Sequence, residues 1–99
     1  MSFVTTQPEA LTAAAGSLAA VGSAMSAQNA AVATPTIGLL PAAADEVSAL
    51  TAAAFAVHGQ LYQAVGAQAA AIHQMFVAML ETSAGSYAAT EAANAIAAR

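Results

Sequence analysis

Apolar side chains recur along this sequence with the three- and four-residue spacing of an α-helix. In residues 7–33 the spacing alternates between three and four, and the positions that follow it are Leu11, Ala14, Leu18, Val21, Met25, Gln28 and Val32. Side chains at this spacing share one face of a helix. The pattern therefore predicts a first helix over about 7–33 with a single apolar face.

The start of this helix carries a recognisable local signature. Thr6 and Glu9 fit the S/T-x-x-E capping box, in which the hydroxyl and the carboxylate each accept a hydrogen bond from a backbone N–H. Pro8 suits the first turn, where its missing N–H has no helical partner. We therefore expect the helix to begin here.

Residues 34–41 interrupt the helical pattern. This segment holds Pro35, Gly38 and Pro41, which favour a turn that reverses the chain. A second helix is predicted over about 42–84, with Asp45 and Glu46 near its start, where negative charge complements the helix dipole. Gly85 is expected just past its end, and residues 85–99 are expected to form a flexible tail.

Two apolar stripes can be traced on the second helix. One consists of Val47, Leu50, Ala54, Val57, Leu61, Val65, Ile72, Met75 and Met79, and the other of Phe55, His58, Tyr62, Val65, Ala69, Ile72, Phe76 and Leu80. An antiparallel hairpin has one helix–helix seam, so the first helix can cover only one of them. The other stripe is left for a binding partner or for a second copy of the chain.

We expect the aromatic stripe to face the partner, because aromatic residues are favoured in interface cores. The predicted interface residues are Phe55, Tyr62, Phe76 and Leu80 on the second helix, and Leu11, Leu18, Val21 and Met25 on the first. The predicted fold is all-α, a long antiparallel two-helix hairpin that forms a single domain of residues 1–99.

Composition explains why such a hairpin would need a partner. The chain is 60% apolar, but 33 of its 99 residues are alanine, which forms helices readily and buries little area. Cysteine is absent, so no disulfide can add stability. Oligomerisation is the remaining source of stability for so small a domain.

The charge balance excludes several classes of partner. Arg99 is the only Lys or Arg residue, and the formal net charge is −4. Nucleic-acid binding needs a basic surface, and anionic lipid attracts one, so neither partner is expected. Residues 10–44 and 47–80 are uncharged and long enough to span a bilayer, but they carry many polar residues and lack flanking positive charge. We expect no conventional membrane span, and no cleaved signal peptide because no positive region precedes Val4.

Candidates for catalysis or metal binding are few. His58 and His73 are 15 residues apart, about 22 Å along one helix, so they cannot share a metal ion or a proton. Each is better interpreted as a partly buried interface residue. Neither a G-x-S-x-G elbow nor a phosphate-binding glycine loop occurs. We expect no catalytic residue, no cofactor and no metal, and an enzyme would rest on two histidines alone.

Four glycines lie inside the predicted helices, where each costs about 1 kcal/mol relative to alanine. They are Gly16, Gly22, Gly59 and Gly66. Close approach of the two helices would explain them, and so would drift in an alanine-rich sequence.

Three segments resemble the PE family of mycobacteria. They are the start Met1-Ser2-Phe3-Val4 followed by Pro8-Glu9, the Pro41-to-Ser48 entry to the second helix, and Tyr87-Ala88-Ala89-Thr90-Glu91. The last matches Y-x-x-x-[D/E], the general type VII secretion signal. The order and spacing of these segments extend the resemblance over essentially all 99 residues, and the chain resembles a PE domain without a C-terminal extension.

The resemblance implies a function. The hairpin would pair with two helices of a PPE protein in an elongated four-helix bundle, and an EspG-type chaperone would bind through the PPE partner. Tyr87 and Glu91 would form this chain's part of the signal for a type VII (ESX) system. The protein would act outside the cytoplasm, at the cell surface or in host interaction. The alternative is a subunit of an outer-membrane pore or nutrient-uptake complex formed with the PPE partner.

Overall fold

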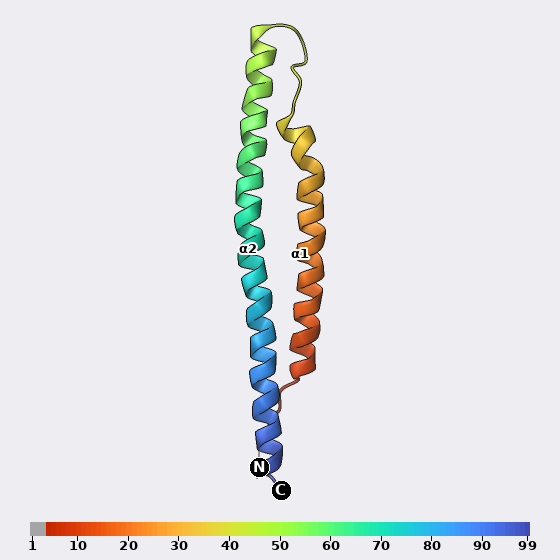
Figure 1. The fold of residues 1–99 in the computed structure, drawn as a ribbon, viewed down its shortest axis with the longest axis vertical. Coiled ribbons are helices and arrows are strands. Elements are labelled where there is room, and N and C mark those ends of the chain that lie inside the picture. The colour runs from red at the N-terminus through yellow and green to blue at the C-terminus, as the bar shows by residue number, and fades with distance from the viewer. Residues whose placement is uncertain (1–3) are drawn as a thin grey trace. The chain divides into compact units, whose positions relative to one another are not determined.

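The computed structural model describes residues 4–99, and these residues form two helices and no strand (Figure 1). Helix α1 spans Pro8–Ile37 and helix α2 spans Glu46–Ala97, which are 30 and 52 residues. Both greatly exceed the usual length of about 11 residues for a helix in a globular protein. The all-α hairpin prediction is confirmed, while Met1 to Phe3 of the predicted family start lie outside the described residues.

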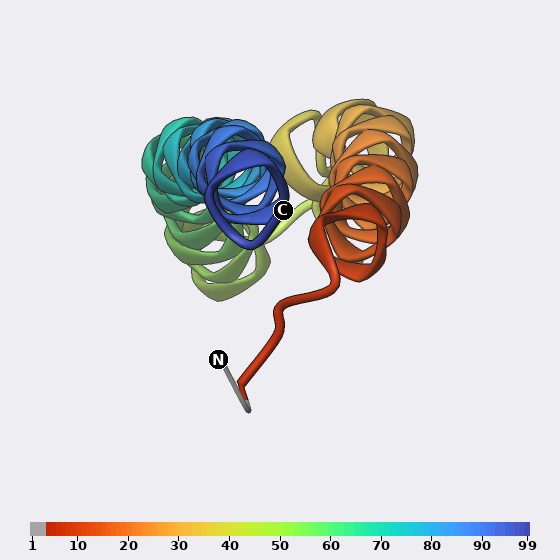
Figure 2. The same cartoon turned by 90° about the horizontal axis from the view of Figure 1, so that it is seen from below.

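Contacts divide the chain into two compact units, which are described separately. Unit 2 is residues 23–72, where the end of α1, the turn and the first half of α2 form an antiparallel helical pair. Unit 1 consists of residues 1–22 and 73–99, where the start of α1 lies beside the last half of α2. Within it, residues 4–7 approach α1 as non-helical chain (Figure 2).

Helix α1 ends four residues later than the sequence predicts, and passes through Pro35. Proline removes one backbone hydrogen bond from the last turns. Other groups bond the carbonyls nearby: the Thr36 hydroxyl donates to the Val32 carbonyl oxygen at 2.6 Å, and the Gly38 N–H donates to that of Thr34 at 2.8 Å. The predicted end near residue 33 is therefore wrong.

Helix α2 begins later than predicted because Asp45 is its N-cap. The Asp45 carboxylate accepts hydrogen bonds from the Ser48 N–H at 2.8 Å and the Ser48 hydroxyl at 2.9 Å. These two bonds, that from the backbone N–H first, hold the pKa of the Asp45 carboxyl below its usual value. Residues 42–45 thus belong to the turn, and the predicted start at about 42 is wrong.

The predicted helix end at Gly85 is also wrong. Helix α2 continues through Gly85 to Ala97, and the glycine has no positive φ. Six of the 13 residues from 85 to 97 are alanine and none is proline, so helix propensity outweighs the cost of one glycine. Tyr87 and Glu91 therefore stand on a continuous helix.

Candidate functional site

The seam of unit 2 is lined by small and polar residues, and the seam of unit 1 also contains half-buried leucine and valine side chains. Buried and partly buried positions recur every three or four residues along both helices. In unit 1 they include Leu11, Ala15, Leu18, Gly22, His73, Val77, Leu80 and Ala84. In unit 2 they include Asn29, Ala33, Ala52, Ala56, Gly59, Gln63, Gly66 and Ala70. Among residues 4–99 only Ala15, Gly59 and Ala84 are buried. The seams therefore hold no buried large side chain.

Glycine makes room for the opposite helix at two positions: for backbone at Gly59 and for the His73 ring at Gly22. A Cβ on Gly59 would lie 2.9 Å from the Thr36 carbonyl oxygen, and one on Gly22 would lie 2.8 Å from Cδ2 of His73. At Gly66 the nearest atom would be 3.3 Å away, whereas Gly16 would meet nothing within 4 Å. Close approach thus explains Gly59 and Gly22 but not Gly16.

Polar side chains cross both seams. In unit 2, the Tyr62 hydroxyl donates to Oδ1 of Asn29 at 2.7 Å, and Nε2 of Gln63 donates to the Asn29 carbonyl oxygen at 2.8 Å. In unit 1, Nε2 of His73 donates to the Leu18 carbonyl oxygen. These bonds fix the register of each pair, because a slip by one helical turn would break them.

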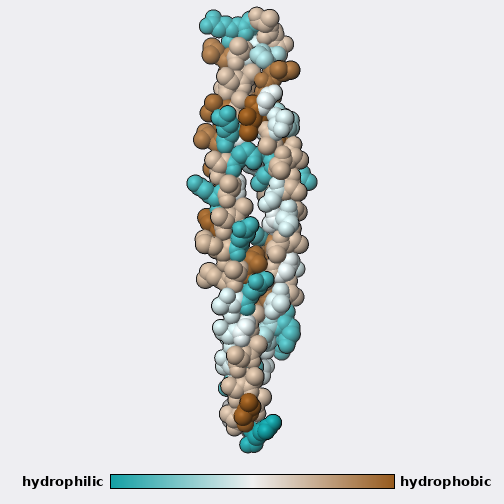
Figure 3. Space-filling model, in the orientation of Figure 1, coloured by the Kyte–Doolittle hydropathy of each residue, from teal (hydrophilic) through white to brown (hydrophobic). Residues whose placement is uncertain are grey.

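Neither large apolar stripe of α2 is covered, which corrects the expectation that α1 would cover one. The exposed large side chains of α2 are Val47, Leu50, Phe55, Val57, Leu61, Tyr62, Val65, Ile72, Met75, Phe76, Met79, Tyr87 and Ile96. Brown apolar atoms accordingly reach the surface along α2 beyond the turn (Figure 3). The sequence argument assumed that the largest residues would form the seam, but a third row of alanine, glycine and polar residues forms it in unit 2, and in unit 1 this row also includes Val77 and Leu80.

Several large side chains of unit 2 lie on one side of the helical pair, whereas Leu50, Val57 and Leu61 point away from the seam. At about 100° per residue, Phe55 and Tyr62 are rotated by about 40° and 60° from Gly59 in one sense. Met25 and Val32 are rotated from Ala33 of α1 in the same sense, by about 80° and 100°. On antiparallel helices the same sense of rotation leads to the same side. We call Met25, Val32, Phe55, Tyr62 and Val65 the apolar face of unit 2.

The same geometry gives unit 1 an apolar face. Its members are rotated in that sense from Ala15 on α1 or Val77 on α2, and they are Leu11, Leu18, Val21, Phe76, Leu80 and Tyr87. Phe76 is 51% exposed and Tyr87 is 47% exposed, whereas Leu11, Leu18 and Leu80 are half-buried at the edge of the seam. All eight predicted interface residues lie on one of the two apolar faces.

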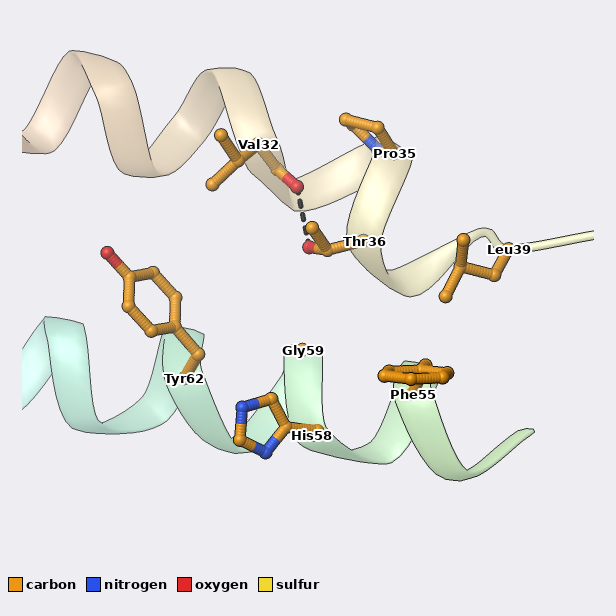
Figure 4. Close-up of a pocket in the computed structure, with 8 residues that line it drawn as sticks. All are labelled: Val32, Pro35, Thr36, Leu39, Phe55, His58, Gly59 and Tyr62. Carbon is orange, nitrogen blue, oxygen red and sulfur yellow. Dashed lines mark hydrogen bonds between the residues drawn. The ribbon is translucent and has the colours of Figure 1, made fainter. Parts of the chain in front are cut away.

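A hollow of about 370 Å³ opens in unit 2 where the helices meet the turn. Figure 4 shows Val32, Pro35, Thr36 and Leu39 on one side, and Phe55, His58, Gly59 and Tyr62 on the other. The ring of Phe55 lies opposite Leu39, and the phenol of Tyr62 extends toward α1. No Asp, Glu, Lys or Arg lines the hollow. Its size and its apolar walls suit a large apolar side chain.

A second hollow, in unit 1, is acidic. Pro8, Glu9 and Thr12 from the start of α1 line it together with Glu81 of α2. Within residues 4–99, no group of three or more His, Cys, Asp or Glu side chains could hold a metal ion. Pro8 and Glu9 thus lie beside a carboxylate that their place in the sequence did not suggest.

The two predicted signal residues, Tyr87 and Glu91, lie one helical turn apart, and Glu91 is held by hydrogen bonds from another segment. Tyr87 is exposed, while Glu91 is partly buried and accepts two hydrogen bonds from Thr6, one from its N–H and one from its hydroxyl, each at 3.0 Å. The expected capping box is therefore wrong, because Glu91 accepts the Thr6 N–H in place of Glu9. No spacing rule in the sequence links positions so far apart.

Comparison with known proteins gives one family. The model of the PE family matches residues 4–94. PE family protein PE13 of Mycobacterium tuberculosis is 62% identical over 98 residues, which are 99% of each chain. PE8 of the same species is 57% identical over 98 residues, and PE_PGRS33, a PE-PGRS family protein, is 59% identical over 95. The chain spans 36% of PE8 and 20% of PE_PGRS33.

Proposed function

The chain belongs to the PE family, and from this premise we propose that it is a non-enzymatic subunit that pairs obligately with a PPE-family protein and is exported by a type VII (ESX) secretion system. The observation that carries the proposal is the pair of exposed apolar faces. A row of exposed large apolar side chains on each unit is the kind of surface that normally binds something.

The packing within each unit supports an obligate partner. Fully burying a large apolar side chain contributes about 1.5–3 kcal/mol, and no large side chain of residues 4–99 is buried. Two partner helices laid on the apolar faces would bury Phe55, Tyr62 and Phe76 and complete a four-helix bundle. The small-residue seam would be one of the seams of that bundle.

Export is the second part of the proposal. Tyr87 and Glu91 match Y-x-x-x-[D/E], and their place on the continuous α2 puts both side chains on one face. We propose that the secretion machinery reads this pair, while an EspG-type chaperone binds through the PPE subunit. The exported pair would act at the mycobacterial cell surface or in host interaction.

Co-expression tests the pairing directly. The chain is expressed alone, with the PPE protein encoded beside it, and with an unrelated PPE protein. We expect soluble protein of one-to-one stoichiometry only with the matching PPE protein, because only that partner covers the apolar faces. A soluble monomer, or a homodimer that does not exchange with any PPE protein, would contradict the proposal.

A mycobacterial secretion assay tests export. Tyr87→Ala and Glu91→Ala are each expected to retain the pair inside the cell at normal abundance, and Thr90→Ala serves as the control within the same motif. Normal export of both variants would remove the signal assignment and leave the pairing proposal intact.

A membrane pore formed with the PPE partner is a second candidate. Helix α1 is long and apolar enough to cross a membrane, with a mean hydropathy of 1.3 in its most apolar window. The same test is passed by helices of soluble proteins, so this observation is the weaker one. Conductance and liposome flotation with the purified pair distinguish the two functions, since a partner-covered bundle would neither float nor conduct.

A further inference from the structure

Thr6 and Glu91 join the segment before α1 to the end of α2, across 85 positions of sequence. Both hydrogen bonds are donated by Thr6, from its backbone N–H and its hydroxyl. Hydrogen bonds to an ionised acceptor are stronger than neutral ones. The contact therefore ties residues 4–7 to the helix that carries Tyr87.

Both bonds go to the same carboxylate oxygen of Glu91. Oε1 accepts the two hydrogens, so Oε2 keeps its own acceptor sites for another donor. A free glutamate side chain samples many rotamers, and two bonds to one oxygen select a single one. Thr6 thus fixes the direction in which Oε2 points, at a position one helical turn from Tyr87.

We infer that Thr6 is a positioning residue of the export signal. It fixes the Glu91 carboxylate on the same helix face as Tyr87. The export machinery then binds a phenol and a carboxylate oxygen that are already oriented. This inference rests on the proposed role of Tyr87 and Glu91 in export. It adds that recognition depends on a residue outside the Y-x-x-x-[D/E] spacing.

The test measures export of the full chain from mycobacteria that also express its PPE partner. Thr6→Val removes the hydroxyl donor at nearly constant volume, and Thr6→Ser restores it. Thr5→Val makes the same chemical change at an exposed neighbour. We expect Thr6→Val to lower the exported fraction about tenfold, which corresponds to about 1.4 kcal/mol. Thr6→Ser and Thr5→Val should export normally.

Two further readouts separate positioning from a structural role. The abundance and the melting temperature of the intracellular pair should be the same for Thr6→Val and Thr5→Val. Thr6→Val combined with Glu91→Gln should export no worse than Glu91→Gln alone, because both changes act on one carboxylate. Hydrogen exchange should show faster exchange of the Thr6 amide in the Glu91→Gln variant.

Each outcome decides between the two claims. Normal export of Thr6→Val, with Glu91→Ala blocked, would overturn the positioning role and leave the proposed function standing. Loss of the intracellular pair in Thr6→Val would also overturn it, since the bond would then serve folding or pairing. Normal export of Glu91→Ala would remove the proposed signal itself.

Discussion

Phe76→Ala tests whether the apolar face of unit 1 is covered by a partner. About half of the Phe76 side chain, 51%, is exposed in the chain alone. A phenylalanine buries about 150–250 Å² when it is covered, so a partner could remove about 100 Å² of Phe76 from water. At about 25 cal/mol per Å² this area contributes about 2.5 kcal/mol to binding.

The substitution keeps Cβ, so we expect it to remove about 2 kcal/mol of this contribution. A loss of that size weakens the complex about 30-fold. Most such changes appear in the dissociation rate. The measurement is therefore dissociation of the purified PE–PPE pair after dilution, followed by exchange with a labelled copy of this chain.

Gln74→Ala is the matched control for Phe76→Ala. Gln74 lies two residues away on the same helix, is also exposed, and is rotated to the other side of the seam. Its replacement should leave the dissociation rate within about twofold of the wild type, as expected for a surface change. Equal rates for the two variants would refute the assignment of this face to the partner.

Two further predictions concern the helical pair itself. Gly59→Ala should lower the free energy of unfolding by about 1 kcal/mol, because a forced overlap costs more than helix propensity returns. Gly16→Ala should raise the free energy of unfolding by about 1 kcal/mol, because a Cβ at Gly16 would meet nothing within 4 Å. Denaturant unfolding of the helical pair measures both variants. Equal effects of the two substitutions would contradict the close approach at Gly59. Because the folded pKa of Asp45 is lowered, its cap is fully formed at neutral pH and is lost as the pH falls below about 4. The protection factor of the Ser48 amide, which is its exchange rate relative to the intrinsic rate at the same pH, should then fall with falling pH in the wild type but not in Asp45→Asn. A pH-independent protection factor in the wild type would refute the cap.

The helices could be predicted from the sequence because they depend on local properties. Alanine content and the proline–glycine turn specify two helices. Their ends were harder to predict, since a competing local group decided each one. Thr36 bonds carbonyls of the helix around Pro35, and Asp45 caps the second helix at Ser48.

The seam could not be predicted from the size of the apolar residues. Leu61 and Ile72 suggested a core by their volume, but they are exposed, while Gly59 lies against the backbone of Thr36 and Ala84 is buried. The Thr6–Glu91 contact could not be predicted either, because it depends on which distant segments the fold brings together. Residue periodicity located the exposed apolar residues of α2, and their role as binding faces stays a prediction.

The small residues of the seam also decide at which step of assembly side-chain conformational entropy is lost. Alanine and glycine have no side-chain rotamers to lose, so packing the two helices at these residues restricts little side-chain motion. On the apolar faces, the exposed Met25, Phe55 and Phe76 side chains keep rotamer freedom that another surface would remove, whereas Asn29 already holds the Tyr62 hydroxyl. Most of that entropic cost is therefore deferred to the encounter with a partner, and an unpaired chain stays open to the proteases and chaperones that remove orphan subunits.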